Sequence, residues 1–402
     1  MRLRTAAPRR GEPNPRPLRG PFASQPIARA TPSSDSIPAM KITDVQAIPL
    51  SIPQKMKFAR STTGLNPESD GHVIVKVFTD AGIVGIGEAF RLTPRAVATF
   101  INEALRPLVV GVDPTRIETL WRRMYLGTFR YGRKGMVLNA ISGVEVALWD
   151  ILGKSCGLPV YKLLGGASWS RVRAYASLPP YERAEDAAAD GAEMAAEGYH
   201  MVKLHQRDIE SVRQTRRAIG PNVDLSVDVN GCWTAREAVA MARQMEEHDV
   251  RWLEEPVQPM DDYDGLRFVR ENSRIPIATG ENEYTHHGFK TLIEKEAADI
   301  LQPDVIKAGG LLCCRKILGI AEAWNVPLIT HSFYYGPGVA ATAHFVMANP
   351  LSDEIEINTT PLENDFIVPN FRPVGGKIEV SDKPGLGIEL DDDVVEHHRI
   401  DR

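Results

Sequence analysis

The chain has 402 residues, of which 43% are hydrophobic and 25% charged, and its formal net charge is −5. This composition is typical of a soluble globular protein, the length is sufficient for more than one domain, and the slight negative charge gives no indication of nucleic-acid binding. No apolar run approaches the roughly 18 residues of a membrane span, and the four cysteines form no CxxC pair that would indicate zinc or a disulfide framework. We therefore expect a cytoplasmic protein that binds neither nucleic acid nor a membrane.

The first 39 residues differ from the rest of the chain. They contain eight prolines, seven arginines, no lysine and only two acidic residues, with no apolar block. Such a segment cannot bury a core, so we predict that residues 1–39 form a disordered extension and that Met40 is the natural start. The missing apolar block argues against a secretory signal, while the arginine-rich bias leaves a transit peptide as an alternative.

Residues 40–165 are predicted to form a first domain. Two stretches of alternating apolar and polar residues with turn residues between them predict a β-hairpin, and apolar residues at spacings of three and four predict helices. The expected strands are Lys41–Pro49, His72–Phe78 and Ile83–Glu88, and the expected helices are Pro94–Val109, Pro114–Tyr125 and Gly135–Lys154.

Residues 166–357 repeat a short apolar run that ends in a polar residue and is followed by a helix-like stretch. This pattern is typical of β/α repeats, in which every strand ends at the same rim of a barrel. The expected strands are Val172–Ser177, Met201–His205, Leu225–Asn230, Trp252–Glu255, Ile277–Glu281, Ile300–Asp304, Pro327–His331 and Glu354–Ile357. The polar residues that mark the ends of the last seven are Lys203, Asp228, Glu254, Glu281, Asp304, His331 and Glu356. Residues 358–402 are expected to return to the first domain, through a strand at Pro384–Leu390.

Three acidic residues in this series, Asp228, Glu254 and Glu281, are separated by 26 and 27 residues. At one rim they would repel one another by about 4 kcal/mol per pair at about 4 Å and an effective dielectric constant near ~20. A divalent cation relieves this repulsion, and a purely oxygen ligand set suits Mg²⁺. We therefore predict that these carboxylates bind one Mg²⁺ per subunit.

The ordered series of motifs resembles the enolase superfamily, in its mandelate racemase / muconate lactonizing enzyme group. The resemblance covers residues 40–402 and rests on AISGVEVALWDILGK, LPVYKLLGG, VKL, DVNG, WLEEP, GEN, QPD, THS and EIE. It implies an α/β fold, with a (β/α)7β TIM-like barrel and an α+β capping domain formed by the N-terminal region and the C-terminal tail. It also implies Mg²⁺ at the three acids, abstraction of the proton α to a substrate carboxylate, and a homo-oligomer.

The other polar strand ends suit this chemistry. Loss of an α-proton from a carboxylate gives a doubly charged enolate, so fixed cations and hydrogen-bond donors stabilise the transition state. Lys203 is expected to face the substrate carboxylate, and Glu356, if protonated, to donate a hydrogen bond from the opposite side. Asp304 and His331 end adjacent strands, so Asp304 is expected to accept the Nδ1–H of His331 and make that histidine the base.

One position departs from a common family pattern. Many members carry Lys-x-Lys at the second strand, where this chain has Lys203-Leu204-His205. Alternation along a strand puts His205 on the same face as Lys203. His205 is a weaker base than a desolvated lysine, which disfavours racemisation by two bases; it could exchange a proton, protonate a leaving hydroxide, bind a substrate hydroxyl or be structural.

Four residues are candidates for substrate binding. Asn230 lies two residues past Asp228, so alternation puts it on the same face, where it would support the metal or the substrate. The resemblance places the loops that carry Arg60 and Arg91 over the barrel mouth, and these cations could bind a distal carboxylate or hydroxyls. Tyr334 follows His331 closely and is expected to wall the pocket.

We therefore predict an enzyme that dehydrates an acid sugar to a 2-keto-3-deoxy acid. The alternative is a racemase, epimerase or cycloisomerase of a hydroxy acid, amino-acid derivative or sugar lactone. A barrel that binds metal or ligand without turnover is the remaining alternative. In each case the partner is a small-molecule carboxylate.

Overall fold

The computed structural model describes residues 40–61, 71–91 and 93–402. All of them belong to one compact unit, Ile37–Arg402. The predicted extension at residues 1–39 lies outside the described residues. The predicted domain boundaries at residues 165/166 and 357/358 remain predictions.

The N-terminal part of this unit, called the cap below, contains a three-stranded antiparallel sheet. Its strands, in the order β1–β2–β3, are Ile42–Ser51, Gly71–Thr79 and Val84–Ala89. The expected hairpin joins β2 to β3, with Gly82 at a φ of 76° in its turn. A Cβ atom at Gly85 or Gly87 would lie 2.2 Å from a backbone carbonyl oxygen of helix α4. These two glycines of β3 therefore allow the strand to pack directly against the helix.

The cap helices follow the sheet in the chain. They are α1 (Pro94–Phe100), the π-helical turn η1 (Ile101–Leu105), α2 (Arg106–Val109), α3 (Ile117–Thr128), α4 (Met136–Cys156) and α5 (Val160–Leu163). The expected helix Pro94–Val109 thus contains a π-turn, which is followed by Pro107, a residue without an N–H to donate to residue 103. Helix α4 is long and apolar enough to cross a membrane, but 89% of its most apolar window is buried inside the protein. It is therefore a core helix.

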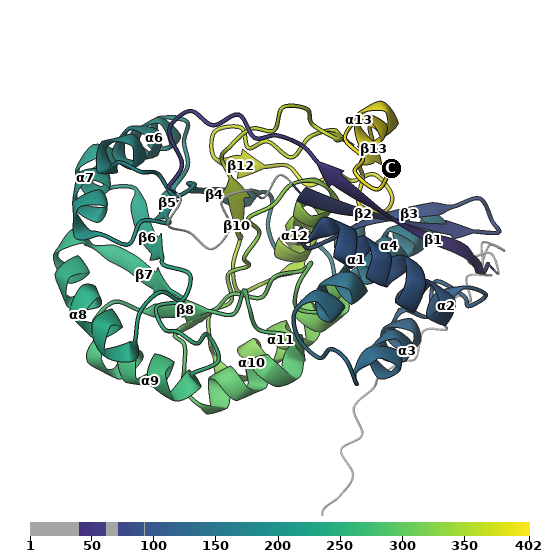
Figure 1. The fold of residues 1–402 in the computed structure, drawn as a ribbon, viewed down its shortest axis with the longest axis horizontal. Helices are drawn as coiled ribbons and strands as arrows, with labels where there is room; N and C mark the ends of the chain where they lie inside the picture. Colours follow the sequence, from purple (N-terminus) through teal and green to yellow (C-terminus); the bar gives the residue numbers. More distant parts are fainter. Residues whose placement is uncertain (1–39, 62–70, 92) are drawn as a thin grey trace, which may run out of the picture. The chain divides into compact units, whose positions relative to one another are not determined.

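The second part of the unit is a barrel of parallel strands surrounded by helices (Figure 1). Its strands are β4 (Val172–Ser177), β5 (Met201–Leu204), β6 (Asp224–Asp228), β7 (Val250–Glu254), β8 (Ile277–Thr279), β9 (Ile300–Leu301) and β10 (Glu354–Asn358). Its helices are α6 (Ala184–Ala196), α7 (Ile209–Ile219), α8 (Ala235–Met245), the short 3₁₀ turn η2 (Glu246–His248), α9 (Tyr263–Asn272), α10 (Thr285–Glu294), α11 (Gly310–Trp324) and α12 (Gly336–Ala348). The predicted β/α alternation is confirmed.

The predicted seventh barrel strand, Pro327–His331, closes the ring without being a regular strand. It pairs through the isolated parallel bridges Leu301↔Leu328 and Asp304↔His331 on one side and Thr330↔Ile355 on the other. Strand β10 then pairs with β4, so the first and last barrel strands are neighbours. This closure brings all the predicted strand ends to one rim.

Large side chains fill the barrel below that rim. A separate core cluster takes one residue from each of six strand positions, namely Tyr175, Met201, Trp252, Ala278, Ile300 and Ile329. The interior below the rim is therefore packed, and the predicted polar residues lie at the carboxyl ends of the strands.

The C-terminal segment returns to the cap, although not in the predicted way. Its elements are β11 (Ile367–Val368), β12 (Lys377–Ile378), β13 (Glu389–Leu390) and α13 (Asp392–His397). The predicted strand Pro384–Leu390 is wrong except for its last two residues, because Gly385 and Gly387 have φ values of 73° and 67°. The segment still reaches the cap, because Gly385 pairs with Pro159 and the backbone N–H of Leu386 donates to Asp150 of α4. The backbone of Arg399 pairs with Leu50 of β1 in the cap sheet.

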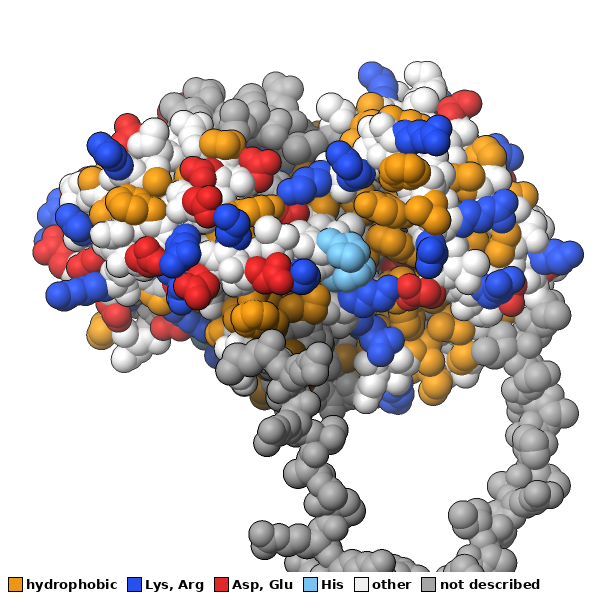
Figure 2. All heavy atoms as spheres, turned by 90° about the horizontal axis from the view of Figure 1, so that it is seen from below, with side chains coloured by type: hydrophobic (Ala, Val, Ile, Leu, Met, Phe, Trp, Pro, Cys, Tyr) orange, Lys and Arg blue, Asp and Glu red, His pale blue; other side chains and the backbone are white. Residues whose placement is uncertain are grey.

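The surface carries charges of both signs. On the face shown in Figure 2, Lys and Arg side chains are interspersed with Asp and Glu side chains across the described residues.

Candidate active site

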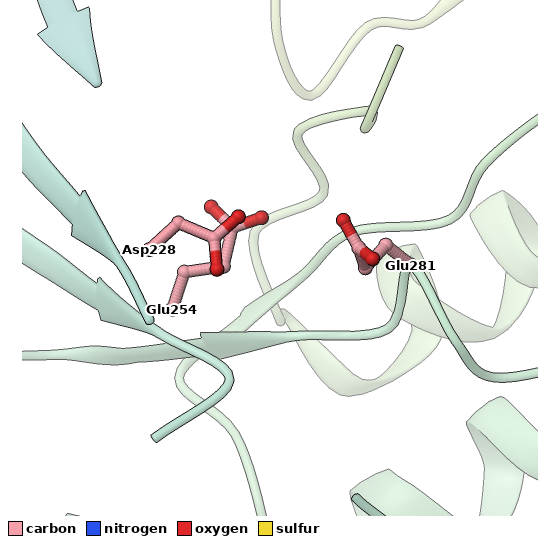
Figure 3. Close-up of side chains that lie close together, drawn as sticks. All are labelled: Asp228, Glu254 and Glu281. Atoms are coloured by element: carbon pink, nitrogen blue, oxygen red, sulfur yellow. The ribbon is translucent and has the colours of Figure 1, made fainter. Parts of the chain in front are cut away.

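Three carboxylates converge at the rim of the barrel (Figure 3). Asp228 and Glu254 are the last residues of β6 and β7 and are paired in register, and Glu281 lies two residues past the end of β8. All three are buried, and one oxygen of each lies within 4.8 Å of the others. The even spacing of these acids in the sequence thus corresponds to one cluster in space.

The charge balance of this cluster fits a divalent cation. Lys203 is the main cation beside it, with Nζ 3.0 Å from Glu254 Oε1 and 3.4 Å from Asp228 Oδ2. Burial raises the pKa of Glu254 to about 7, and repulsion from the neighbouring carboxylates adds to this although Lys203 opposes it. A second buried lysine, Lys307, lies 3.4 Å from Glu281 Oε1, so two lysines face three carboxylates. A divalent cation fits this excess of negative charge, and an oxygen-only donor set is what Mg²⁺ prefers.

Lys203 lies on β5 and is completely buried. Burial lowers the pKa of its ammonium group, but Glu254, Glu356 and Asp228 outweigh this and hold the pKa well above its usual value. Lys203 is thus a fixed cation at this site and not a proton acceptor.

Glu356 lies on β10, opposite the triad. Its Oε1 is 2.7 Å from Lys203 Nζ, and its Oε2 accepts the backbone N–H of Ser332 at 2.9 Å. Burial would raise the pKa of Glu356, but Lys203 and His331 outweigh burial and lower it. In this arrangement the lysine favours the ionised form of Glu356, and donation of a hydrogen bond by a protonated Glu356 remains a prediction.

His331 and Asp304 form a hydrogen-bonded pair beside the acids. Nδ1 of His331 donates to Asp304 Oδ2 over 2.6 Å, and Nε2 lies 2.7 Å from Glu281 Oε2. Burial lowers the pKa of His331, but Glu281, Glu356 and Asp304 raise it well above its usual value. Nε2 of His331 therefore points to the metal-binding cluster, where a substrate would also bind.

His205 follows β5 and faces the same cluster. Its Nδ1 lies 2.6 Å from the carbonyl oxygen of Leu178, and its Nε2 lies 3.3 Å from Asp228 Oδ2. A carbonyl oxygen only accepts, so Nδ1 carries a proton and Nε2 is the nitrogen that faces the site. The ring of Phe333 packs against the imidazole with centroids 5.1 Å apart.

Of the predicted substrate-binding residues, Asn230 contacts the acidic triad directly, whereas Arg60 and Arg91 lie around the site. The backbone of Asn230 donates to Asp228 Oδ1 over 2.9 Å, and its φ of 47° ends the strand, so alternation no longer fixes its side chain. The backbone of Arg60 pairs with Tyr181, just past β4, which puts this cap segment at the rim. Arg91 is buried, with its guanidinium 5.4 Å from the centroid of the Phe333 ring. Substrate binding by these residues remains a prediction.

Tyr334 is engaged with the histidine–aspartate pair. Its hydroxyl lies 3.4 Å from Asp304 Oδ1 and 2.9 Å from Thr342 Oγ1, and its ring is buried. Its position supports Asp304 from behind, and contact with substrate stays a prediction.

Some residues of the site were not found by sequence reasoning. Gln302 donates to Glu254 Oε2 over 2.8 Å, and Asn282 and Lys307 contact Glu281. The regular spacing of strand ends does not predict a role for Lys307, because this residue lies in the turn after Asp304. The one available signal for Asn282 was its place next to a predicted ligand.

Comparison with known proteins agrees with this geometry. The model for the "Mandelate racemase / muconate lactonizing enzyme, N-terminal domain" matches residues 43–165, and that for the "Enolase C-terminal domain-like" family matches residues 186–394. The chain belongs to the mandelate racemase / muconate lactonizing enzyme group of the enolase superfamily. It is therefore an enzyme with the predicted barrel and capping domain, and the alternative of a non-catalytic barrel is set aside.

Similar members of the superfamily catalyse two kinds of reaction. D-Xylonate dehydratase of Haloferax volcanii is 33% identical over 82% of this chain and 85% of its own length. D-Galactarolactone cycloisomerase of Agrobacterium fabrum is 32% identical over 82% of this chain and 91% of its own. The crystal structure of the 3,6-anhydro-D-galactonate cycloisomerase from Zobellia galactanivorans has a TM-score of 0.79 and 32% identity, covering 90% of this chain and 99% of that one.

Proposed function

We propose that the protein is a Mg²⁺-dependent dehydratase that converts an acid sugar to a 2-keto-3-deoxy acid. The observation that carries this proposal is the arrangement around the acidic triad: the His331–Asp304 pair on one side and the Lys203–Leu204–His205 segment on the other. Asp228, Glu254 and Glu281 would hold the Mg²⁺. When bound, the ion supplies positive charge to the carboxylate of the substrate.

His331 is the proposed base. Its Nδ1–H is committed to Asp304, so Nε2 is the nitrogen that takes the α-proton. Asp304 fixes the ring orientation and stabilises the imidazolium that forms. The ammonium of Lys203, held by Glu254 and Glu356, lies where negative charge develops on the carboxylate oxygens.

His205 is the proposed proton donor to the departing hydroxyl. Its Nδ1–H is held by the Leu178 carbonyl, so the proton that it gives up is the Nε2 proton of the imidazolium form, which leaves the neutral Nδ1–H tautomer. In the balanced reaction His331 removes the α-proton, the β-hydroxyl leaves as water with a proton from His205, and the resulting enol becomes the keto acid. Two-base racemisation is disfavoured, because a histidine replaces the second lysine of Lys-x-Lys.

Cycloisomerisation is the second candidate. It is favoured by the two cycloisomerases among the similar proteins, which share 32% identity with this chain. This reaction uses the same proton abstraction, but the group eliminated or added is the ring oxygen of a lactone or anhydro sugar acid.

The test is incubation of the full chain with Mg²⁺ in D₂O and a library of acid sugars, sugar lactones and other α-substituted acids. We expect a keto acid that has lost one water, which would identify the substrate. Isomerisation without loss of water establishes the cycloisomerase instead, and exchange of the α-proton alone points to a racemase or epimerase. His331→Asn should be inactive in every assay, and activity that survives it contradicts the assignment of the base.

Further expectations follow the same proposal. The substrate is a small-molecule carboxylate, the protein acts in the cytoplasm, and the resemblance predicts a homo-oligomer. Each of these stays a prediction.

A further inference from the structure

A buried lysine approaches the acidic triad from the side of the cap. Lys307 lies in the turn between β9 and α11, and only 2% of its surface is exposed. Its Nζ lies 2.9 Å from Asn282 Oδ1 and 3.4 Å from Glu281 Oε1. Burial lowers the pKa of Lys307, but Glu281 and other nearby groups outweigh this and raise it, so the residue is a cation.

Lys307 fixes the orientation of the Asn282 amide. An ammonium group only donates, so it must meet the carbonyl oxygen of the amide, and the NH₂ group is turned the other way. That NH₂ group lies 2.7 Å from Glu281 Oε1 and 3.0 Å from Glu255 Oε2. With the amide reversed, its carbonyl oxygen would face two carboxylates and the hydrogen bond to Glu281 would be lost.

The contacts of Asn282 and Lys307 with Glu281 engage only one of its carboxylate oxygens, so the second oxygen can bind a metal ion. Oε1 is occupied by Asn282 and Lys307, whereas Oε2 faces His331. Groups that contact a metal ligand in this way set its orientation and often affect metal affinity as strongly as the ligand geometry does.

The cap contributes to the same chain of contacts. The Nζ of Lys307 lies 4.4 Å from the centroid of the Phe90 ring, at the end of the cap sheet. A ring face at this distance attracts a cation and also shields it from water, which strengthens its other interactions. Phe90 therefore links the position of the cap to Lys307.

We propose that Lys307 is a positioning residue that orients the metal ligand Glu281 through Asn282, and that Phe90 makes this orientation depend on the cap. The inference rests on the proposed Mg²⁺ site but not on the identity of the substrate. Simple charge balance predicts the opposite effect: loss of a cation beside the acids would tighten Mg²⁺ binding. The direction of the change in Mg²⁺ affinity therefore distinguishes positioning of Glu281 from simple charge balance.

The experiment is calorimetric titration of the full chain with Mg²⁺ in the absence of substrate. Lys307→Met should weaken binding by about 10- to 100-fold. Phe90→Leu should weaken Mg²⁺ binding by about two- to fivefold in the wild-type chain. It should leave the affinity unchanged in the Lys307→Met background, since its effect passes through the lysine.

The matched controls are Lys316→Met, which replaces a lysine of α11 paired with Glu118, and Phe100→Leu, which replaces a cap residue that packs on Tyr131. Neither control should change the affinity.

Several results would overturn the inference. Tighter Mg²⁺ binding by Lys307→Met leaves charge balance as the role of this lysine, and unchanged binding means that Lys307 does not orient Glu281. An equal effect of Phe90→Leu in both backgrounds removes the link to the cap. Thermal unfolding checks that each variant is folded. If Lys307→Met does not fold, Asn282→Ala must show a loss of at least about tenfold, and normal affinity in that variant contradicts the inference. Failure of the wild-type chain to bind Mg²⁺ contradicts the proposed function itself.

Discussion

At the scale of single residues, the two histidines of the site differ in what holds them. Nδ1 of His331 donates to the carboxylate of Asp304, whereas Nδ1 of His205 donates to the neutral carbonyl of Leu178. A carboxylate partner stabilises the imidazolium far more than a carbonyl does. This difference suits His331 to accept a proton, and suits the less stabilised imidazolium form of His205 to release its Nε2 proton.

This difference predicts separable effects of two substitutions. His205→Gln should slow release of water by about 100-fold or more, because the departing hydroxyl loses its proton donor. The same variant should still exchange the α-proton of the substrate with D₂O, because His331 is intact. His331→Asn should abolish both reactions, and nuclear magnetic resonance of the substrate in D₂O measures both. Unchanged dehydration by His205→Gln would mean that His331 serves as both base and acid.

The sequence predicts those site residues that stand at strand ends. The β/α rhythm places Lys203, Asp228, Glu254 and Glu281 at one rim, because every strand of such a barrel ends there. It cannot place Lys307, whose position depends on the path of a turn, nor Phe333, which reaches His205 from the loop past the seventh strand position. The sequence also cannot give the 2.7 Å contact between Glu356 and Lys203, which favours the ionised form of the acid.

At the scale of elements, cap helix α4 is joined to barrel helix α11 by Glu145. Its carboxyl group accepts two backbone N–H groups of the first turn of α11, from Leu311 and Leu312, each over 2.8 Å, and the indole N–H of Trp149 over 2.6 Å. A Cβ atom at Gly310 would lie 2.0 Å from this carboxylate. The VEVALW segment (residues 144–149) and the AGG segment (residues 308–310) thus form one contact between the cap and the barrel, called the joint below. In it the Glu145 side chain pairs with the N–H groups at the N-terminus of α11.

Removal of this joint should destabilise the fold in a pH-dependent way. Glu145→Ala leaves two buried N–H groups unpaired, and we expect a loss of about 2–4 kcal/mol at pH 6. Burial raises the pKa of Glu145 from 4.5 to about 8, so its contribution is fully present below 4.5 and is lost as the pH rises through about 8. The destabilisation should therefore be smaller at pH 9 than at pH 6. Urea unfolding at both pH values measures it.

A surface contact between another cap helix and the same barrel helix α11 is the control for this prediction. Glu118 of α3 pairs with Lys316 of α11 at 2.6 Å, but its side chain is 63% exposed. Glu118→Ala should change the stability by less than about 1 kcal/mol at either pH. A loss equal to that of Glu145→Ala would mean that capping of α11 is not what joins the two parts.

Elements with regular periodicity were predicted better than those set by local backbone chemistry. The strands and helices of the β/α repeat follow from hydrophobic spacing. The departures occur at Ile101–Leu105, where the predicted helix takes a π-turn, and at Gly385 and Gly387, whose positive φ values interrupt the predicted C-terminal strand. Hydrophobic spacing does not specify these local conformations.

At the scale of the whole molecule, the face of the barrel opposite the active site is held by one buried carboxylate. Glu354 begins β10 and contacts Arg251 of β7 at 2.8 and 2.9 Å, His200 before β5 at 2.8 Å, and Arg173 of β4 at 3.3 Å. It thus joins the last barrel strand to three others. Burial would raise the pKa of Glu354, but His200 and Arg251 outweigh it and lower the pKa to about 2.

This network should make barrel closure sensitive to acid. The folded-state pKa of Glu354 lies below its usual 4.5, so its stabilisation is present above 4.5 and is lost as the pH falls through about 2. Glu354→Gln should lower the free energy of unfolding by about 2 kcal/mol at pH 7, a value reduced because its arginine partners are partly exposed. The difference from the wild type should shrink steadily between pH 5 and pH 3 in urea unfolding. Glu379→Gln, which removes an exposed partner of Arg171, should show no such trend. A difference for Glu354→Gln that is constant with pH would mean that its carboxylate acts through packing and not through its charge.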